Sequence, residues 1–408
     1  MISKKARAMK WSVRWVAFLM LCVGLYLNPT SSDAKDILIG LSQDITGIMA
    51  AEGRTHTDAS LMAIEEWNAK GGIKGQKIES VFMNHGGDPV RATGNAKILK
   101  DKGVCFVHGG SNSTVAIAEM KVLAPAQIPA TGGAASTAIY QEKGPEGKPY
   151  YFSGVGADPI LARGHLDAAA VQGLKKVAIL YLNVAWPRDI MLIMKEWVER
   201  EYGPKYGMSI IGTIEADVNA SDLSLQVNQF RAMNPDVIIA PIYQANSLAL
   251  ARALNDANWR PPLVINWSNA DKAWEKASDK KIFYNLAGPS YYDGNRPDAL
   301  AKRAAFVKKY GYEPTAHWAP TYDCMNLALT AIQDVGPDPV AIRNWLATKA
   351  YGKPGLICGK KGMTCKFQDK EETWIGKTGR YYSLYDGTDY AFVWINKEGQ
   401  IDWSKLNK

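Results

Sequence analysis

The chain has 408 residues, with 48 lysines and arginines against 40 aspartates and glutamates, so its formal net charge is +8. This length suffices for two domains, each with its own core. No arginine cluster alternates with aromatic residues, so the positive charge does not indicate nucleic-acid binding, and five cysteines are too few for a disulfide-rich mini-domain.

The first 34 residues have the order of features that is typical of a secretory signal peptide. Five basic residues lie between Lys4 and Arg14, and an apolar stretch follows at 16–27. This stretch is shorter than the roughly 20 apolar residues that span a bilayer. Ser32-Asp33-Ala34 then places small residues at both positions that signal peptidase reads, so we expect cleavage after Ala34 and a periplasmic mature chain.

A lipoprotein is the alternative, because Cys22 lies inside the apolar stretch, but Leu21 before it is too large for lipid-type processing. Cleavage would remove five basic residues and one acidic residue, leaving 43 against 39 and a net charge of +4. No later stretch is long and apolar enough to cross a membrane, so we expect no stable membrane insertion.

Short β-branched runs alternate with amphipathic stretches from residue 37 onward. In the first series we predict strands at 37–41, 81–82 and 104–108 and helices at 58–68, 91–101 and 113–123. In the second we predict strands at 177–182, 210–214, 237–240 and 263–266 and helices at 190–202, 223–233 and 247–257. Such alternation favours parallel sheets with helices on both faces, and two series predict two doubly wound α/β lobes.

The segments between and after these series suggest how the lobes are joined. Residues 151–158 (YFSGVGAD) suit a crossover, and predicted helices at 297–310 and 321–335 most simply complete the first lobe. Strands at 381–386 and 390–395 are predicted to pair antiparallel across Gly387. We therefore assign residues 35–154 and 288–352 to the first lobe and residues 155–287 and 353–408 to the second.

Candidate ligand contacts follow the predicted strands, because ligands in open α/β sheets lie beyond the carboxyl ends of the strands. Four loops of the first lobe stand out: 42–47 with Asp44, 51–54 with Glu52, 109–113 and 131–136. Their glycines let a ligand approach the backbone, and helix N-termini attract carboxylates or other electron-rich groups. Alternatively, Ser111 and Ser113 merely cap a helix.

The second lobe offers an aromatic residue after each of three strands, namely Trp186, Tyr243 and Trp267. One such residue alone is often part of the core or rim. Three of them facing a polar first lobe favour contact with a ligand.

Motifs for catalysis or metal binding are absent from the sequence. It contains no Gly-Lys-Ser/Thr loop, His-Glu-x-x-His pair or Gly-x-Ser-x-Gly elbow. The five histidines lack metal-ligand spacing, and we interpret His85 and His108 as interior or rim residues. Asp44 and Glu52 would form a carboxylate pair with no accompanying nucleophile. We therefore expect neither a metal, nor a cofactor, nor enzymatic activity.

Cys358 and Cys365 lie seven residues apart in a Gly- and Lys-rich loop. In an oxidising compartment this pair favours a local disulfide. Zinc binding is the alternative, but no histidine lies near the pair, and Cys105 and Cys324 are in apolar segments.

Five segments, in this order, resemble the branched-chain amino-acid-type periplasmic binding proteins, the solute receptors of ABC importers. They are SQDITG, ASLMAIEEWNAKGGIKGQKIE, GGSNS, IPATGGAAS and PTYDCMNLAL, and the resemblance spans residues 36–350. It implies a type I periplasmic binding fold, in which a three-crossover hinge joins two doubly wound lobes. It also implies that a small-molecule ligand is held between closing lobes and that importer permease subunits are partners.

The resemblance further implies roles for individual residues. The hydroxyls and backbone amides of two turns would bind a carboxylate or its equivalent, while two aromatic residues close from the other lobe. These residues are Ser111, Asn112, Ser113, Gly133, Ala134 and Ser136, and then Trp186 and Tyr243.

Two departures from the family pattern concern the ligand. Amino-acid binders carry an acidic residue near Trp267, where this chain reads Asn266-Trp267-Ser268-Asn269-Ala270-Asp271, so only Asp271 could hold an ammonium. Glu52 stands about where such binders carry an aromatic contact. Because a buried carboxylate is costly unless paired, Glu52 predicts a polar or cationic ligand, or a salt bridge to Arg54.

We therefore expect a solute-binding protein for an amino acid or amide-like compound, with a small or aromatic carboxylate as a further option. An extracytoplasmic ligand sensor of the same fold is the alternative. A secreted hydrolase that uses Asp44 or Glu52 is a third hypothesis.

Overall fold

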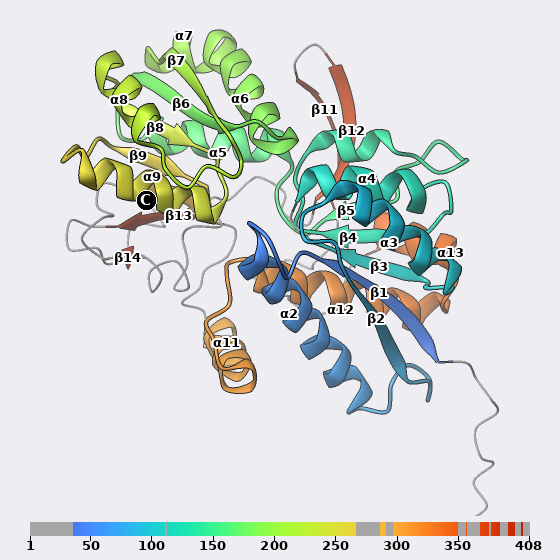
Figure 1. The fold of residues 1–408 in the computed structure, drawn as a ribbon. Helices are drawn as coiled ribbons and strands as arrows, with labels where there is room; N and C mark the ends of the chain where they lie inside the picture. Colours follow the sequence, from blue (N-terminus) through green and yellow to red (C-terminus); the bar gives the residue numbers. More distant parts are fainter. Residues whose placement is uncertain are drawn as a thin grey trace, which may run out of the picture.

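The computed structural model describes residues 36–110, 112–266, 286–290, 297–349, 356, 368–374, 377–383, 391–395 and 401–402. The described strands form two seven-stranded sheets, one in each of two lobes (Figure 1). The first lobe contains the first sheet, which includes β1 to β5, and the second lobe contains the second sheet, which includes β6 to β10.

The first sheet runs in the order β11-β12-β5-β4-β3-β1-β2, with β1 between β3 and the edge strand β2. Its strands are β1 (Ile37–Gln43), β2 (Ile78–Asn84), β3 (Phe106–Gly109), β4 (Ala130–Gly132), β5 (Tyr151–Ser153), β11 (Gln368–Trp374) and β12 (Lys377–Ser383). Strands β1 to β5 pair in parallel. Six of the seven residues of β1 are buried, as expected for a strand covered on both faces.

The second sheet runs in the order β14-β13-β10-β9-β8-β6-β7. Its strands are β6 (Lys176–Leu182), β7 (Ser209–Ala216), β8 (Val237–Ala240), β9 (Leu263–Ile265), β10 (Leu286–Ser290), β13 (Ala391–Ile395) and β14 (Ile401–Asp402). Strands β6 to β10 pair in parallel. The two parallel series that the sequence predicts are confirmed.

Helices cover both sheets. In the first lobe α2 (Ala50–Asn68) packs against α12 (Trp318–Val335), and α3 (Pro89–Asp101) packs against α4 (Ser113–Leu123) on the other side of the strands (Figure 1). α11 (Pro297–Tyr310) lies against α2, and α13 (Pro339–Thr348) against α12. Helices α11 and α12 therefore pack on the first lobe.

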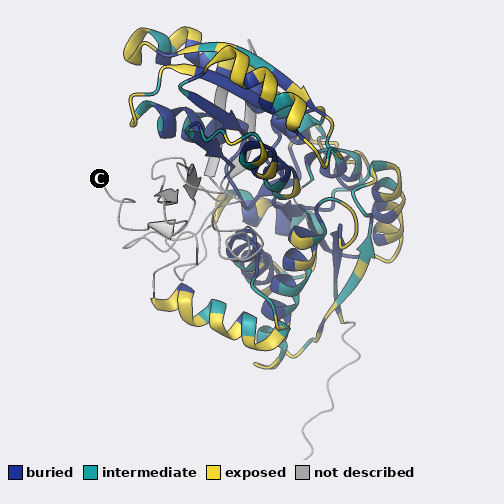
Figure 2. Cartoon of the chain, turned by 60° about the vertical axis from the view of Figure 1, so that its left-hand side comes forward, coloured by how far each residue is buried: buried dark blue, intermediate teal, exposed yellow. Residues whose placement is uncertain are grey.

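In the second lobe α5 (Asp158–Ala170) packs against α6 (Ala185–Trp197), and α8 (Ser224–Met233) against α9 (Gln244–Asp256). A π-helical turn at Val198–Tyr202 and α7 (Gly203–Tyr206) continue α6, and a 3-10 helix, η1, spans Thr137–Gln141 in the first lobe. Figure 2 shows buried strands in both lobes and exposed residues along the outer faces of the helices.

Several predicted boundaries were wrong. Helix α2 begins at Ala50 rather than at residue 58, so residues 51–54 form its first turns and not a loop. Helix α6 begins at Ala185 rather than at 190. The first turns of α2 lack a regular apolar stripe, because their buried positions include polar residues such as Glu52. In α6 the apolar stripe extends one turn further toward the N-terminus, to Trp186.

The predicted hairpin across Gly387 is also wrong. Strand β12 pairs antiparallel with β11 and adjoins β5 of the first sheet, whereas β13 pairs antiparallel with β10 of the second. The strands of the tail are thus shared between the two lobes, although the sequence assigned all of 353–408 to the second. The chain passes between the sheets three times: from β5 to α5, from β10 to α11 and from β12 to β13.

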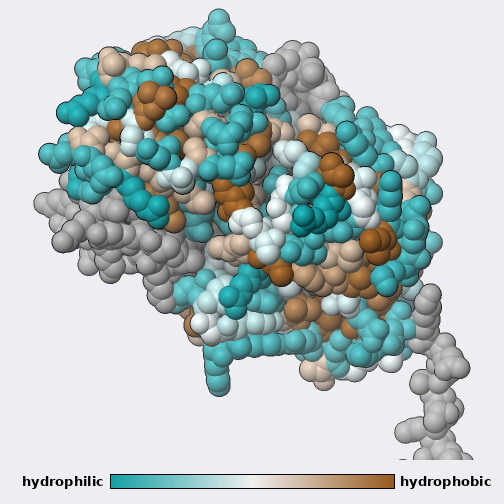
Figure 3. All heavy atoms as spheres, in the orientation of Figure 1, coloured by the Kyte–Doolittle hydropathy of each residue, from teal (hydrophilic) through white to brown (hydrophobic). Residues whose placement is uncertain are grey.

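The surface gives little indication of further contacts. Large exposed hydrophobic residues, such as Val90, Val171 and Leu225, belong to different elements. On the face in Figure 3, hydrophobic residues are scattered among hydrophilic ones.

No helix in the described part of the chain combines the length and the apolarity that crossing a membrane requires. Cys105 and Cys324 are buried free thiols, while residues 1–34, Cys358 and Cys365 lie outside the described residues.

Candidate ligand-binding site

A cavity lies between the two lobes and is lined from both. Its empty volume is about 330 Å³, including space open to solvent. The first lobe contributes Met49, Glu52, Gly133, Ala135 and His317, and the crossover and second lobe contribute Val155, Leu161, Trp186, Tyr243 and Asn266.

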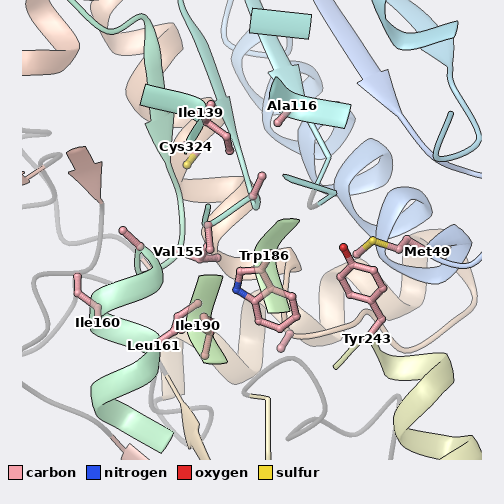
Figure 4. Packing of buried hydrophobic residues seen from close by; sticks show 14 of the residues in the cluster. Met49, Ala116, Ile139, Val155, Ile160, Leu161, Trp186, Ile190, Tyr243 and Cys324 are labelled. Atoms are coloured by element: carbon pink, nitrogen blue, oxygen red, sulfur yellow. The ribbon is translucent and has the colours of Figure 1, made fainter. Parts of the chain in front are cut away.

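Two aromatic side chains, both expected from the sequence to contact a ligand, form the second-lobe wall of this cavity. Trp186 lies in the first turn of α6, and Tyr243 is the N-cap residue of α9. Their rings stack with centroids 5.7 Å apart and an angle of 15° between planes. Trp186 lies near Val155 and Leu161, and the Tyr243 hydroxyl points toward Met49 across the cavity (Figure 4).

Glu52 reaches the cavity because α2 begins early. It lies in the first turn, where the helix dipole favours a carboxylate, and is only 3% exposed. The next residue, Gly53, packs so closely on the preceding loop that a Cβ there would overlap the carbonyl oxygen of Asp44. Arg54 lies over the Tyr312 ring and faces Asp58, with its Nε 3.8 Å from Oδ2 of that residue.

Asp44 lies behind Glu52 and is also buried. Burial raises the pKa of Asp44 to about 7, and its own backbone N–H partly opposes this rise. Burial is the main cause that raises the pKa of Tyr243. The negative charge of Asp44 raises it further, and the charge of Glu52 does so to a smaller extent. These couplings place Asp44 and Glu52 of the first lobe close to Tyr243 of the second.

A further buried carboxyl, Glu119 of α4, was not predicted from the sequence. Burial raises the pKa of Glu119 to about 8; the Ser42 hydroxyl lowers it and the Asp44 carboxyl raises it further. A Cβ at Gly109 would lie 3.2 Å from its Oε2, so the GGSNS turn packs on this side chain.

The two turns expected to bind a carboxylate are held by hydrogen bonds within the protein. Asn112 caps α4 by accepting from the backbone N–H groups of Thr114 and Val115, so the helix cap is neither of the two serines suggested. Ser113 Oγ accepts from Ser136 N at 3.2 Å. Ser136 Oγ donates to Asp189 Oδ2 on α6 at 2.9 Å, which links the two lobes directly.

Only one of two neighbouring residues in the loop after β4, Gly133 and not Ala134, reaches the cavity. The backbone N–H of Ala134 donates to Tyr151 Oη at 3.0 Å, and its carbonyl accepts from Tyr151 and Ser153. Both backbone polar groups of Ala134 are therefore used inside the first lobe.

Three histidines that are distant in the sequence meet beneath Gly133. The His56 ring centroid lies 5.3 Å from that of His108 and 4.9 Å from that of His317, which lines the cavity. A Cβ at Gly133 would lie 2.8 Å from His317 Nδ1 and 2.9 Å from His56 Nε2, so only glycine fits there.

Hydrogen bonds connect His56 and His108 with each other and with two threonines. His56 Nδ1 lies 3.1 Å from His108 Nε2 and 2.6 Å from Thr321 Oγ1, and His108 Nδ1 lies 2.8 Å from Thr131 Oγ1. Burial lowers the pKa of His108 and of His317 to about 3, and that of His56 well below its usual value. All three rings are therefore neutral at physiological pH.

The interpretation of His108 as an interior residue fits this arrangement. His85 is also buried, and its Nδ1 accepts from Gly87 N. No spacing in the sequence predicted that His56 and His317 would meet. No group of three or more His, Cys, Asp or Glu side chains suited to a metal ion occurs among the described residues.

Four predicted contacts, Ser111, Trp267, Asn269 and Asp271, lie outside the described residues. Asn266, which directly precedes Trp267, lines the cavity. The described part of the site thus unites Glu52, Gly133, Trp186 and Tyr243 in one cavity, with Asp44 beside it and Asn112, Ser113 and Ser136 engaged in the protein.

Comparisons with known proteins identify relatives along most of the chain. A family model described as "Periplasmic binding protein" matches residues 36–373. The Leu/Ile/Val-binding protein homolog 7 of Brucella melitensis is 22% identical over 396 residues, which cover 86% of this chain and 89% of the relative.

Solved structures of the same fold include proteins with different ligands. The substrate-binding protein LivJ of a branched-chain amino acid transporter from Streptococcus pneumoniae, in complex with isoleucine, has a TM-score of 0.73 and 18% identity, covering 90% of this chain and 98% of LivJ. A solute-binding protein of an ABC transporter from R. palustris, in complex with benzoate, has a TM-score of 0.70 and 17% identity, covering 86% and 97%. These structures support the two-lobed type I fold.

Proposed function

The chain belongs to the periplasmic binding protein family, and on this premise we propose that it is the extracytoplasmic solute-binding component of an ABC importer. In this role it captures a small solute between its lobes and presents it to the importer permease subunits. The observation that carries the proposal is the cavity lined by both lobes, with acidic Glu52 on one side and the stacked Trp186 and Tyr243 on the other.

The lining residues indicate the chemistry of the solute. Met49, Val155, Leu161 and the two aromatic rings favour a flat or apolar body. Glu52, Asn266 and the Tyr243 hydroxyl favour a polar end with hydrogen-bond donors. We therefore propose an amino-acid-like, amide-like or amine-bearing solute.

A carboxylate solute receives less support. The relatives noted above include one in complex with isoleucine and one in complex with benzoate. In this chain, however, the Ser136 hydroxyl, one of the two expected to bind a carboxylate, already donates its proton to Asp189. No observation favours the sensor or the hydrolase.

Mass spectrometry of gently purified periplasmic protein tests the proposed function. We expect a small solute to co-purify, and we expect it to be recovered unchanged after long incubation with the protein. Recovery of a hydrolysed product would contradict a pure binding role.

Loss of solute uptake in a deletion strain, restored by the wild-type gene, would link binding to import.

Export and tail structure belong to the same proposal. We propose that the signal peptide is removed after Ala34 and that Cys358 and Cys365 form a disulfide. The cysteines would close a short loop, which should contribute about 2–3 kcal/mol to stability. Peptide mapping under non-reducing conditions should recover the linked peptides, and two free thiols in periplasmic protein would disprove the pairing.

A further inference from the structure

At the Glu52 end of the cavity, several buried oxygen atoms have no hydrogen-bond donor. Neither carboxylate oxygen of Asp44 has a partner in any other described residue, and the same holds for Gln43 Oε1 and Tyr243 Oη. Asp44 is 1% exposed, Gln43 0% and Tyr243 4%. We call these three residues the acceptor compartment.

The orientation of Gln43 is fixed, so its free atom is an acceptor. Gln43 Nε2 donates to the carbonyl oxygen of His108 at 2.9 Å. A flipped amide would set two acceptors against each other, which excludes the alternative assignment. Gln43 Oε1 must therefore point away from His108.

Gln43 Oε1 and Asp44 Oδ1 converge on Gly110. A Cβ at Gly110 would lie 3.1 Å from each of these oxygens, so they are at most about 6 Å apart (twice 3.1 Å). Two acceptors on either side of one point, one of them a carboxylate, suit a donor-rich group between them. Glycine at 110 keeps this space clear of a side chain.

No protein cation supplies that group among the described residues. Burial raises the pKa of Asp44 and its own backbone N–H lowers it slightly, with no contribution from a lysine or arginine. A buried carboxylate without a counter-ion is costly. Glu52 adds negative charge nearby rather than removing it.

The compartment adjoins the solute cavity. Tyr243 lines the cavity and its pKa responds to both Asp44 and Glu52. The stacked Trp186 and Tyr243 rings can also stabilise a cation that lies against their faces. Tyr243 is the one compartment residue that lines the cavity, so the end of a solute would have to pass Tyr243 to reach Asp44 and Gln43.

We infer that the acceptor compartment binds a cationic, donor-rich nitrogen group of the solute, such as an amidinium, guanidinium or primary ammonium, with Asp44 as its counter-ion. Gln43 and Tyr243 provide further hydrogen-bond partners, and the apolar body of the solute lies against the aromatic wall. This inference rests on the proposed function and specifies the solute class for the same cavity.

Three probes that share one ring but differ in charge test this inference: benzamidine (cation), benzamide (neutral) and benzoate (anion). Isothermal titration calorimetry would use full-length mature protein that has been freed of co-purified solute by unfolding and refolding. We expect benzamidine to bind at least tenfold more tightly than either of the other probes. Equal or tighter binding of benzamide or benzoate would overturn the inference.

Two variants distinguish direct contact between Asp44 and the cationic group from the effect of any buried carboxyl near the cavity. Asp44→Asn should weaken benzamidine binding by tenfold or more and leave benzamide binding nearly unchanged. Glu119→Gln removes a second buried carboxyl outside the compartment, and it should keep the preference for benzamidine within about threefold. Retention of that preference in Asp44→Asn, or its loss in Glu119→Gln alone, would contradict the role of Asp44.

Co-purified solute distinguishes failure of this inference from failure of the proposed function. If mass spectrometry identifies an anion or a compound without a cationic nitrogen, the inference is wrong and solute binding stands. If neither a natural solute nor any probe binds, the proposed function itself is wrong.

Discussion

Replacement of Asp44 by Asn should change how the stability of the protein depends on pH. Asp44 is fully buried, and its pKa is raised from 3.8 to about 7. A group whose folded-state pKa is raised contributes stability that is fully present below its unfolded pKa and is lost as pH rises through the folded pKa. For Asp44 this loss therefore falls between about pH 4 and pH 7.

The size of the effect follows from the shift. A shift of about three pKa units, at about 1.4 kcal/mol each, corresponds to roughly 4 kcal/mol of stability lost between acidic and neutral pH. Asn cannot ionise, so Asp44→Asn should escape that loss. The variant should gain up to about 4 kcal/mol over wild type as pH rises from 4 to 8.

Urea unfolding followed by tryptophan fluorescence at pH 4, 5, 6, 7 and 8 measures this difference. Buried histidines also titrate in this range, but they are present in both proteins and cancel in the comparison. Glu119, with a pKa of about 8, should make the free energy of unfolding depend on pH above pH 7 in both wild type and Asp44→Asn. Glu52 and Tyr243 are the other titratable groups that interact with one another and with Asp44.

Asp101→Asn is the matched control, because the Asp101 side chain is 71% exposed. It should leave the pH dependence of stability unchanged. If Asp44→Asn and wild type differ by the same free energy at pH 4 and at pH 8, Asp44 is not a buried, uncompensated carboxyl and the reasoning fails.

Four further outcomes can be measured. Glu52→Gln should weaken binding of a co-purified cationic solute by roughly 2–5 kcal/mol in calorimetry, because it leaves a charge unpaired; an unchanged affinity would make Glu52 a structural residue. Ser136→Ala removes the interlobe hydrogen bond to Asp189, so the closed form should lose about 0.5–1.5 kcal/mol, seen as a larger radius of gyration in X-ray scattering, whereas an identical radius would deny that bond a role in closure. Gly133→Ala should lower the melting temperature, because its Cβ would meet two histidine rings and such overpacking costs about 1–3 kcal/mol; an unchanged temperature would show that the rings can move. The intact mass of periplasmic protein should match a chain that begins at Lys35, and a mass retaining the apolar leader would disprove cleavage.

Much of the architecture could be predicted from the sequence. Helices at 113–123 and 297–310 were located to the residue. Alternating strands and helices determine local structure through hydrophobic periodicity, a property of neighbouring residues. The aromatic wall was predictable for the same reason, since Trp186 and Tyr243 directly follow strands whose carboxyl ends face one edge of the sheet.

Other features depend on partners that are distant in the chain. The N-terminal turn of α2 carries Glu52 and His56 at buried positions, and such residues weaken the apolar pattern that marks a helix. Strands β12 and β13 are close in sequence, yet they join different sheets. A short strand pairs with whichever sheet edge the rest of the fold presents, so its partner cannot be deduced from its own residues.

The sequence by itself determined the two parallel lobes, the glycine-rich turns and the aromatic residues that face them, because each depends on local pattern. Only the tertiary structure decided that His56, His108 and His317 meet beneath Gly133 and that Ser136 reaches Asp189 across the lobes. It also decided that Asp44 is buried without a cation among the described residues. Burial and pairing depend on what long-range packing places around a side chain, and these surroundings set the charge and hydrogen-bonding character of the site.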